Sequence, residues 1–216
     1  MDTLHFKIIT LGQIICRYKA PPEVWQPFNT IYEERGSSLP DAGGLLAGRL
    51  KEQRSFYYAG DKPGPIAKHN AGVSNEALNW FKDKFSHYVE VNKIKDAKHR
   101  IDAIWLNQYQ PHEYNPVHVH RGDLNTGFTG VLMLKIPTSD VEGHGMLQII
   151  GNGTGYFAKT DYIPKNLEPG DFFIFPYDMR HMVYPLSGKG DETRRTVAVN
   201  CDCYCDPVLT AAGEES

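Results

Sequence analysis

The chain has 216 residues, enough for one domain with a substantial hydrophobic core. Its 23 Lys and Arg side chains against 26 Asp and Glu give a net charge of −3, which argues against nucleic acid as a partner. The longest apolar runs, such as residues 172–176, are far too short to cross a bilayer, so no membrane partner is expected.

The first residues of the chain predict its cellular location, and the spacing of its cysteines predicts whether the thiols are reduced. The start Met1-Asp2-Thr3 lacks the charged-then-apolar pattern of a secretory signal, so we expect a cytoplasmic protein. Three of the four cysteines, Cys201, Cys203 and Cys205, alternate on one predicted strand face. A zinc site would usually show a Cys-x-x-Cys pair and a fourth ligand, so reduced structural thiols are the expectation.

Residues 1–100 are expected to be helical and irregular. Pro21 and Pro22 mark a helix start, Pro27 predicts a kink or a late start, and Gly36 can end the helix. Ser74 is a plausible N-cap for a second helix, whose apolar stripe follows at spacings of three and four: Leu78, Phe81, Phe85 and Tyr88. The loop-rich segment 60–71 could form a lid.

From residue 101 onward the pattern is that of short strands separated by turn residues. The predicted strands are 101–109, 128–136, 146–150, 156–163, 172–176 and 193–201. Their connections are too short for parallel crossovers. The sequence therefore predicts a mainly β fold with N-terminal α elements, a jelly roll or cupin-like barrel with supporting helices. We expect a single domain over 1–216, with residues 1–100 as support and 101–205 as its core.

Two histidines lie two residues apart in Pro116-Val117-His118-Val119-His120. On an extended segment, residues at this spacing point to the same side, so His118 and His120 can aim both imidazoles at one point. Neutral imidazole is the common nitrogen ligand of divalent metals. Surface or hydrogen-bonded histidines would give the same pattern.

Two later segments add candidates. His181 opens an apolar strand and should face the barrel interior, either as a metal ligand or as a core histidine bonded to a carbonyl. Arg194 and Thr196 share one face of the last strand, and Arg195 lies on the other. A buried arginine needs an anion that it can bind in a forked geometry, whereas arginines on an edge strand need none.

Together these segments resemble the iron(II)- and 2-oxoglutarate-dependent oxygenases, and most closely a branch found in marine bacteria and their phages. The resemblance covers about residues 101–201. It rests on the His118-x-His120 pair, the block from Gly170 through His181, and the block from Arg194 to Asn200. It implies a double-stranded β-helix that binds Fe(II) and 2-oxoglutarate.

The resemblance leaves the third metal ligand open, because the wider family has a carboxylate where His120 stands. In one interpretation His118, His120 and His181 form an all-histidine site. In another, Asp123 supplies the carboxylate. In a third the site is degenerate and holds no iron. We favour the first, because the spacing places His118 and His120 together.

The function implied by the resemblance is that of a dioxygenase that consumes O₂ and 2-oxoglutarate, releases succinate and CO₂, and hydroxylates an unactivated C–H bond. Arg194 and Thr196 would bind the far carboxylate of 2-oxoglutarate, and Asn107 and Tyr109 would line the same pocket. The substrate would be a small molecule or a peptide or protein, for example a prolyl or other peptidyl side chain.

Two other classes of protein fit parts of the pattern. A cupin-type metal enzyme could use three histidines without 2-oxoglutarate, and its activity would survive Arg194→Ala. A non-catalytic β-sandwich binding module would hold no metal, and His181→Ala would then affect stability alone.

Overall fold

The structure is a computed structural model that describes residues 6–10, 13–43, 50–60, 68–124, 126–138, 143–151, 161–187 and 192–205. The helices in these segments are α1 (Pro22–Arg35), α2 (Asn75–Val91) and the single 3-10 turn η1 (Gly36–Ser38). The strands are β1 (Phe6–Thr10), β2 (Ile14–Lys19), β3 (Glu52–Tyr58), β4 (His69–Asn70), β5 (Ala97–Tyr109), β6 (Asn115–His118), β7 (Gly127–Lys135), β8 (Leu147–Ile150), β9 (Asp161–Tyr162), β10 (Asp171–Pro176), β11 (Arg180–Val183) and β12 (Arg194–Cys205).

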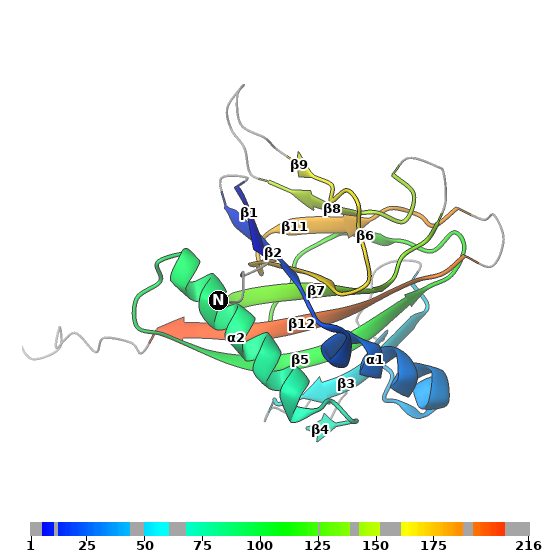
Figure 1. The fold of residues 1–216 in the computed structure, drawn as a ribbon, viewed down its shortest axis with the longest axis horizontal. Coiled ribbons are helices and arrows are strands. Elements are labelled where there is room, and N and C mark those ends of the chain that lie inside the picture. Colours follow the sequence, from blue (N-terminus) through cyan, green and yellow to red (C-terminus); the bar gives the residue numbers. More distant parts are fainter. Residues whose placement is uncertain are drawn as a thin grey trace, which may run out of the picture.

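The strands form two antiparallel sheets (Figure 1). The main sheet has eight strands in the order β1-β2-β10-β7-β12-β5-β3-β4, and the minor sheet has four in the order β6-β11-β8-β9. Strands that neighbour one another in space, such as β7 and β12, are far apart in sequence, as expected for a jelly roll. The predicted mainly β jelly-roll fold is confirmed.

Alternation along the main-sheet strands divides the core into two layers. On β10, Phe172 and Ile174 belong to the cluster that packs against the helices, whereas Phe173 and Phe175 belong to the cluster shared with the minor sheet. Successive side chains on a strand point to opposite faces, so the apolar run of β10 serves both layers at once. Alternate residues of β10 therefore line the space between the sheets.

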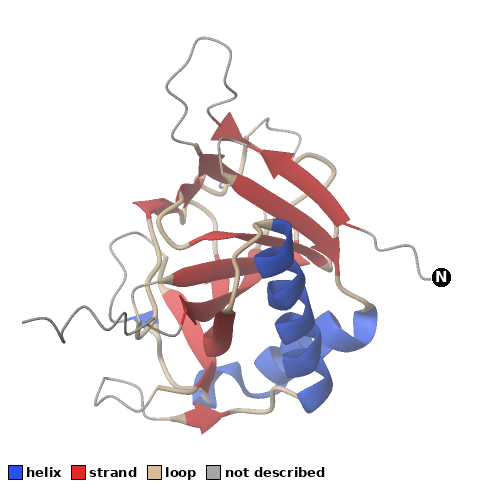
Figure 2. Ribbon diagram, turned by 90° about the vertical axis from the view of Figure 1, so that its left-hand side faces the viewer, coloured by secondary structure: helices blue, strands red, loops and turns tan. Residues whose placement is uncertain are grey.

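Both helices lie on the outer face of the main sheet (Figure 2). Helix α2 begins as predicted, because the Ser74 hydroxyl accepts a hydrogen bond from Ala77 N at 3.1 Å. Its Phe81 and Phe85 are fully buried against Phe172 of the sheet. Helix α1 runs through Pro27 without interruption, so the predicted late start is wrong. None of the helices described is long and apolar enough to cross a membrane.

The N-terminal half contributes more strand than the sequence predicts. Strand β2 pairs with β10 on one side of the main sheet, and β3 pairs with β5 on the other. Residues 1–100, expected to lean helical and irregular, therefore also contribute strands to the main sheet. Strand β2 is a six-residue run bounded by Gly12 and Pro21, and these turn residues could have identified it as a strand.

The C-terminal strand is longer than predicted, because β12 continues to Cys205 along β5. Cys201 and Cys203 are buried in the helix-side core, in agreement with the structural interpretation. The side chain of Cys205 lies outside the described residues. So do most of the predicted strand 156–163 and residues 61–67 of the possible lid.

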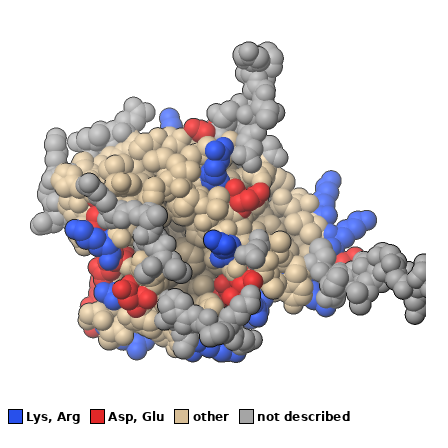
Figure 3. Space-filling model, turned by 180° about the vertical axis from the view of Figure 1, so that it is seen from behind, with Lys and Arg blue, Asp and Glu red and all other residues tan. Residues whose placement is uncertain are grey.

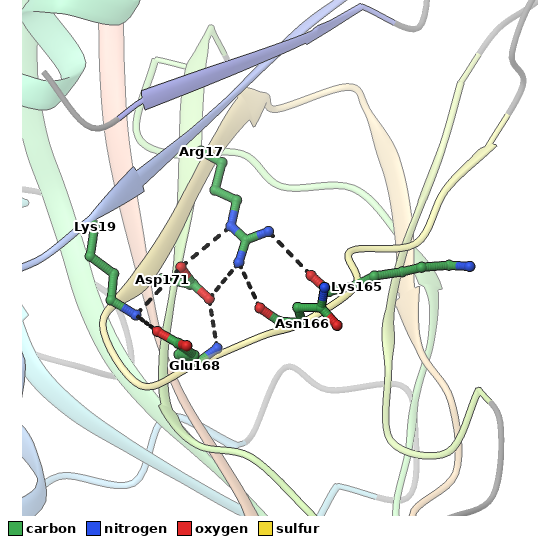
Figure 4. Close-up of polar contacts among 6 residues, drawn as sticks. All are labelled: Arg17, Lys19, Lys165, Asn166, Glu168 and Asp171. Atoms are coloured by element: carbon green, nitrogen blue, oxygen red, sulfur yellow. Dashed lines mark hydrogen bonds and ion pairs between the residues drawn. The ribbon is translucent and has the colours of Figure 1, made fainter.

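A charged network joins the N-terminal strand β2 to the start of β10 (Figure 4). Arg17 donates two hydrogen bonds to the buried Asp171 carboxylate, at 3.3 and 2.8 Å, and Asp171 also accepts from Glu168 N at 2.6 Å. The turn needs Gly170, whose φ of +93° lies in a region that other residues rarely adopt. These contacts hold β2 against the barrel.

Candidate metal centre and adjoining cavity

Three histidines converge at one end of the space between the sheets. His118 on β6 is the register partner of His181 on β11, and His120 follows two residues after His118. One ring nitrogen from each lies within 4.8 Å of the others. Strand pairing thus brings together residues that are about sixty positions apart in sequence.

The Nδ1 atom of each ring faces an oxygen atom. His118 Nδ1 lies 2.7 Å from Pro116 O, His181 Nδ1 lies 3.0 Å from Met179 O, and His120 Nδ1 lies 3.0 Å from Asn200 Oδ1. A carbonyl oxygen can only accept, so each Nδ1 carries the proton and donates it. Each Nε2 is then left with its lone pair, the arrangement that metal-binding histidines adopt.

The spacing of the Nε2 atoms fits a metal ion. His120 Nε2 and His181 Nε2 lie 3.0 Å apart. Two ligand nitrogens about 2.1 Å from one ion and at right angles to each other would be separated by about 3.0 Å. Two unprotonated nitrogens facing each other at this distance repel unless a cation lies between them. The donor set therefore fits a divalent transition metal.

Burial keeps all three imidazoles in the neutral form that a metal requires. Burial lowers the pKa of His118, and it lowers the pKa of His120 to about 3, with a further contribution from His118. Burial beside His120 also lowers the pKa of His181 well below its usual range. Aromatic rings enclose the group, because Trp105 stacks on His120 and Phe175 packs edge-on against His181.

Asp123, the alternative carboxylate, lines the same cavity but is not part of the histidine group. Its two oxygens lie 3.5 Å from Tyr58 OH and from Arg100 Nη2. Asn115 contacts the group, with Nδ2 3.3 Å from His118 Nε2. The exposed His112 is also outside the group.

A cavity of about 750 Å³ opens beside the three histidines, between the two sheets. Its walls include Asn107 and Tyr109 of β5 and Arg194 and Thr196 of β12. On the surface seen from behind, acidic and basic side chains of the described residues are interspersed (Figure 3). That face therefore carries no field of a single sign.

Arg194 is a buried cation that faces this cavity. Its residue is 2% exposed, and its Nη1 has no hydrogen-bond partner among the described residues. The guanidinium carbon lies 5.0 Å from the centre of the Tyr109 ring, the Tyr109 side chain interacts with the guanidinium, and Nη2 lies 3.7 Å from the Met133 sulfur. A buried charge with this little compensation is costly unless an anion binds it.

A chain of polar side chains ends next to Arg194. Gln53 Nε2 donates to Asn107 Oδ1 at 2.5 Å, and Asn107 Nδ2 donates to Thr196 Oγ1 at 3.5 Å. Because the Thr196 oxygen already accepts from Asn107, its own hydrogen remains available to donate. Thr196 is 1% exposed and lies on the same face of β12 as Arg194. The pair can bind one carboxylate.

Arg195 lies on the opposite face, as the alternation predicts, but it is not solvent-exposed. Helix α1 covers it: Arg195 donates to Asn29 Oδ1 at 2.7 Å and Glu33 Oε1 at 3.0 Å, and its guanidinium lies over the Tyr32 ring. It also donates to Gln108 Oε1 at 2.7 Å. The two arginines therefore differ, since the Arg195 guanidinium forms an ion pair with Glu33 and hydrogen bonds to two side-chain amides.

The sequence predicts neither Gln53 nor Asn200 as a site residue. Gln53 comes from β3, a strand that the sequence did not predict. Asn200 ends the alternating segment of β12, and its period-two relation to Arg194 and Thr196 could have placed it on the cavity face. Only the fold shows that it meets His120, 80 residues earlier.

Comparison with known proteins gives the same fold at low sequence identity. No protein-family model matches the sequence, and no curated protein matches it. Among solved structures, a prolyl-4-hydroxylase from Pseudomonas putida is 9% identical, with a TM-score of 0.56 over 86% of this chain and 91% of that one. An oxidoreductase of the 2OG-Fe(II) oxygenase family from Burkholderia pseudomallei is 13% identical, with a TM-score of 0.55 over 82% and 77%.

A third similar structure contains ligands. HygX from Streptomyces hygroscopicus, with nickel and 2-oxoglutarate bound, is 9% identical, with a TM-score of 0.53 over 93% of this chain and 84% of that one. The chain therefore has the fold of 2-oxoglutarate-dependent oxygenases, as the sequence resemblance implied.

Proposed function

We propose that the protein is an iron(II)- and 2-oxoglutarate-dependent dioxygenase that hydroxylates a C–H bond. One observation carries the proposal: a single cavity holds three convergent neutral imidazoles and a buried guanidinium that no carboxylate of the described residues pairs with. A metal ion and a dicarboxylate would complete both groups at once. The similar structures that bind nickel with 2-oxoglutarate, or that are named prolyl hydroxylases, support the same assignment.

In this proposal His118, His120 and His181 hold the metal through Nε2. Iron(II) bound there would supply the activation of dioxygen that hydroxylation of an unactivated C–H bond requires. Arg194 and Thr196 bind the far carboxylate of 2-oxoglutarate, and Asn107 orients the Thr196 hydroxyl toward it. The indole of Trp105, which covers His120, limits the access of water to the metal side of the cavity.

The substrate would enter past the outer rim of the cavity. Val117 and Val119 alternate with the metal-site histidines, line the cavity and are 50% and 53% exposed. This apolar rim suits a small molecule or a side chain of a peptide, including a prolyl ring. Succinate and CO₂ would be the products of 2-oxoglutarate.

The test is an anaerobic titration of metal-stripped protein with iron(II), with and without 2-oxoglutarate, followed by visible absorbance. We expect a charge-transfer band only when both are present. Arg194→Ala should raise the concentration of 2-oxoglutarate that is needed to form the band. The matched control Arg195→Ala should not change that concentration. Tight metal binding without a band would overturn the proposal in favour of a cupin-type enzyme. Failure to bind metal would leave a non-catalytic module.

A further inference from the structure

We infer that Asn200 is a positioning residue that makes His120 a neutral metal donor, so that the metal site is built for three imidazoles. The inference rests on the proposed function, because it takes His118, His120 and His181 as the ligands. It argues against the degenerate interpretation, in which the site holds no iron. The evidence for the inference is the set of contacts around His120.

The orientation of the Asn200 amide follows from its two partners. Its Nδ2 donates to Arg121 O at 3.2 Å, and that carbonyl can only accept. The amide oxygen must therefore face His120 Nδ1, 3.0 Å away. An imidazole that donates from Nδ1 presents its Nε2 lone pair, so this amide selects the metal-binding tautomer.

Other contacts hold the His120 ring in place. Trp105 stacks on it, with ring centres 5.6 Å apart and an interplanar angle of 25°. The Thr129 hydroxyl lies 3.4 Å from His120 Nδ1, and the backbone N–H of His120 donates to Tyr177 O at 2.9 Å. The backbone, the ring plane and the tautomer of this residue are thus each supported by a separate contact.

A carboxylate would fit poorly at this position. An aspartate at 120 is shorter than the imidazole and has no donor to offer the Asn200 oxygen. The amide could not turn to present Nδ2 without giving up its bond to Arg121 O. A buried amide oxygen would lose its partner, which costs free energy. The surroundings of His120 are complementary to an imidazole.

The test measures cobalt(II) affinity by visible absorbance in the full chain, with no activity assay. Asn200→Leu should weaken cobalt binding by roughly 10- to 100-fold, the usual cost of removing a residue that orients a metal ligand. Asn200→Asp keeps an acceptor for His120 Nδ1 and should restore the affinity. Gln108→Leu removes a buried amide from the opposite face of the sheet and should leave the affinity unchanged.

A second readout separates positioning from folding. Nitrogen-15 NMR of the metal-free protein should show His120 protonated at Nδ1 in the unmodified chain and in Asn200→Asp, and a mixture of tautomers in Asn200→Leu. His120→Asp should bind cobalt more weakly than the unmodified protein, although it introduces a negative charge.

The outcomes are distinguishable. If Asn200→Leu binds cobalt as tightly as the unmodified protein, or if His120→Asp binds it more tightly, the inference is overturned and the proposed function stands. If the unmodified protein binds neither cobalt(II) nor iron(II), the proposed function fails and the inference fails with it.

Discussion

Replacing Arg194 with methionine should stabilise the protein and at the same time abolish tight binding of 2-oxoglutarate. The guanidinium is buried, its Nη1 has no partner among the described residues, and its close contacts are a tyrosine ring and a sulfur atom. Without a bound anion, the buried guanidinium destabilises the folded state. When 2-oxoglutarate binds, the same guanidinium contributes to the affinity for it. The two effects should therefore have opposite signs.

The magnitudes follow from these contacts. Exchanging a poorly compensated buried ion for an apolar side chain of similar length should raise the free energy of unfolding by about 2 kcal/mol. For a chain of this size that corresponds to roughly 4–8 °C in Tm. Two lost hydrogen bonds between the guanidinium and a carboxylate, each about 1.5 kcal/mol, should raise the Kd for 2-oxoglutarate about 150-fold.

Thermal unfolding of the metal-free protein and calorimetric titration of 2-oxoglutarate into the cobalt-loaded protein measure the two effects. Arg195→Met is the matched control, because it removes the neighbouring guanidinium from its bonds to Gln108, Asn29 and Glu33. It should lower the stability by about 1–3 kcal/mol and leave the Kd unchanged. The reasoning is refuted if Arg194→Met destabilises the chain and still binds 2-oxoglutarate normally.

Three further substitutions test other parts of the structure. Gln53→Leu should raise the Kd for 2-oxoglutarate about tenfold, because Asn107 loses the partner that orients it. The affinity for cobalt should not change. An equal loss of affinity for 2-oxoglutarate and for cobalt would contradict the idea that Gln53 acts only on the 2-oxoglutarate side of the cavity. Ser74→Ala should cost about 1 kcal/mol, or roughly 2–4 °C in Tm, whereas Ser74→Asp should retain the cap; equal melting of all three proteins would exclude a capping role. Asp171→Asn should lower the free energy of unfolding in urea by about 2 kcal/mol through the loss of its pair with the partly exposed Arg17, and an unchanged midpoint would show that the network does not stabilise the fold.

The sequence alone predicts features that depend on neighbours along the chain. Period two places Arg194 and Arg195 on opposite faces of one strand, and it places His118 and His120 on one side of an extended segment. The Ser74 cap and the apolar stripe of its helix are equally local, and the structure confirms both. The jelly-roll fold could be predicted because many short strands with short connections leave few other architectures.

Strand membership of the N-terminal half could not be predicted in the same way. Strands β2 and β3 are stable because each pairs with a distant strand, β10 and β5 respectively. A short alternating run gives no information about the edge to which it will add. The position of Gln53 beside Asn107 depends entirely on the second of these pairings.

The composition of the candidate metal site was likewise decided by tertiary structure. Strand register places His181 opposite His118, and the chain path holds Asp123 against Tyr58 and Arg100, outside the histidine group. His120 obtains its tautomer from Asn200, 80 residues away. The sequence shows which residue types could bind a metal. Only the fold decides which lone pairs converge, because hydrogen bonds between distant strands orient each ring.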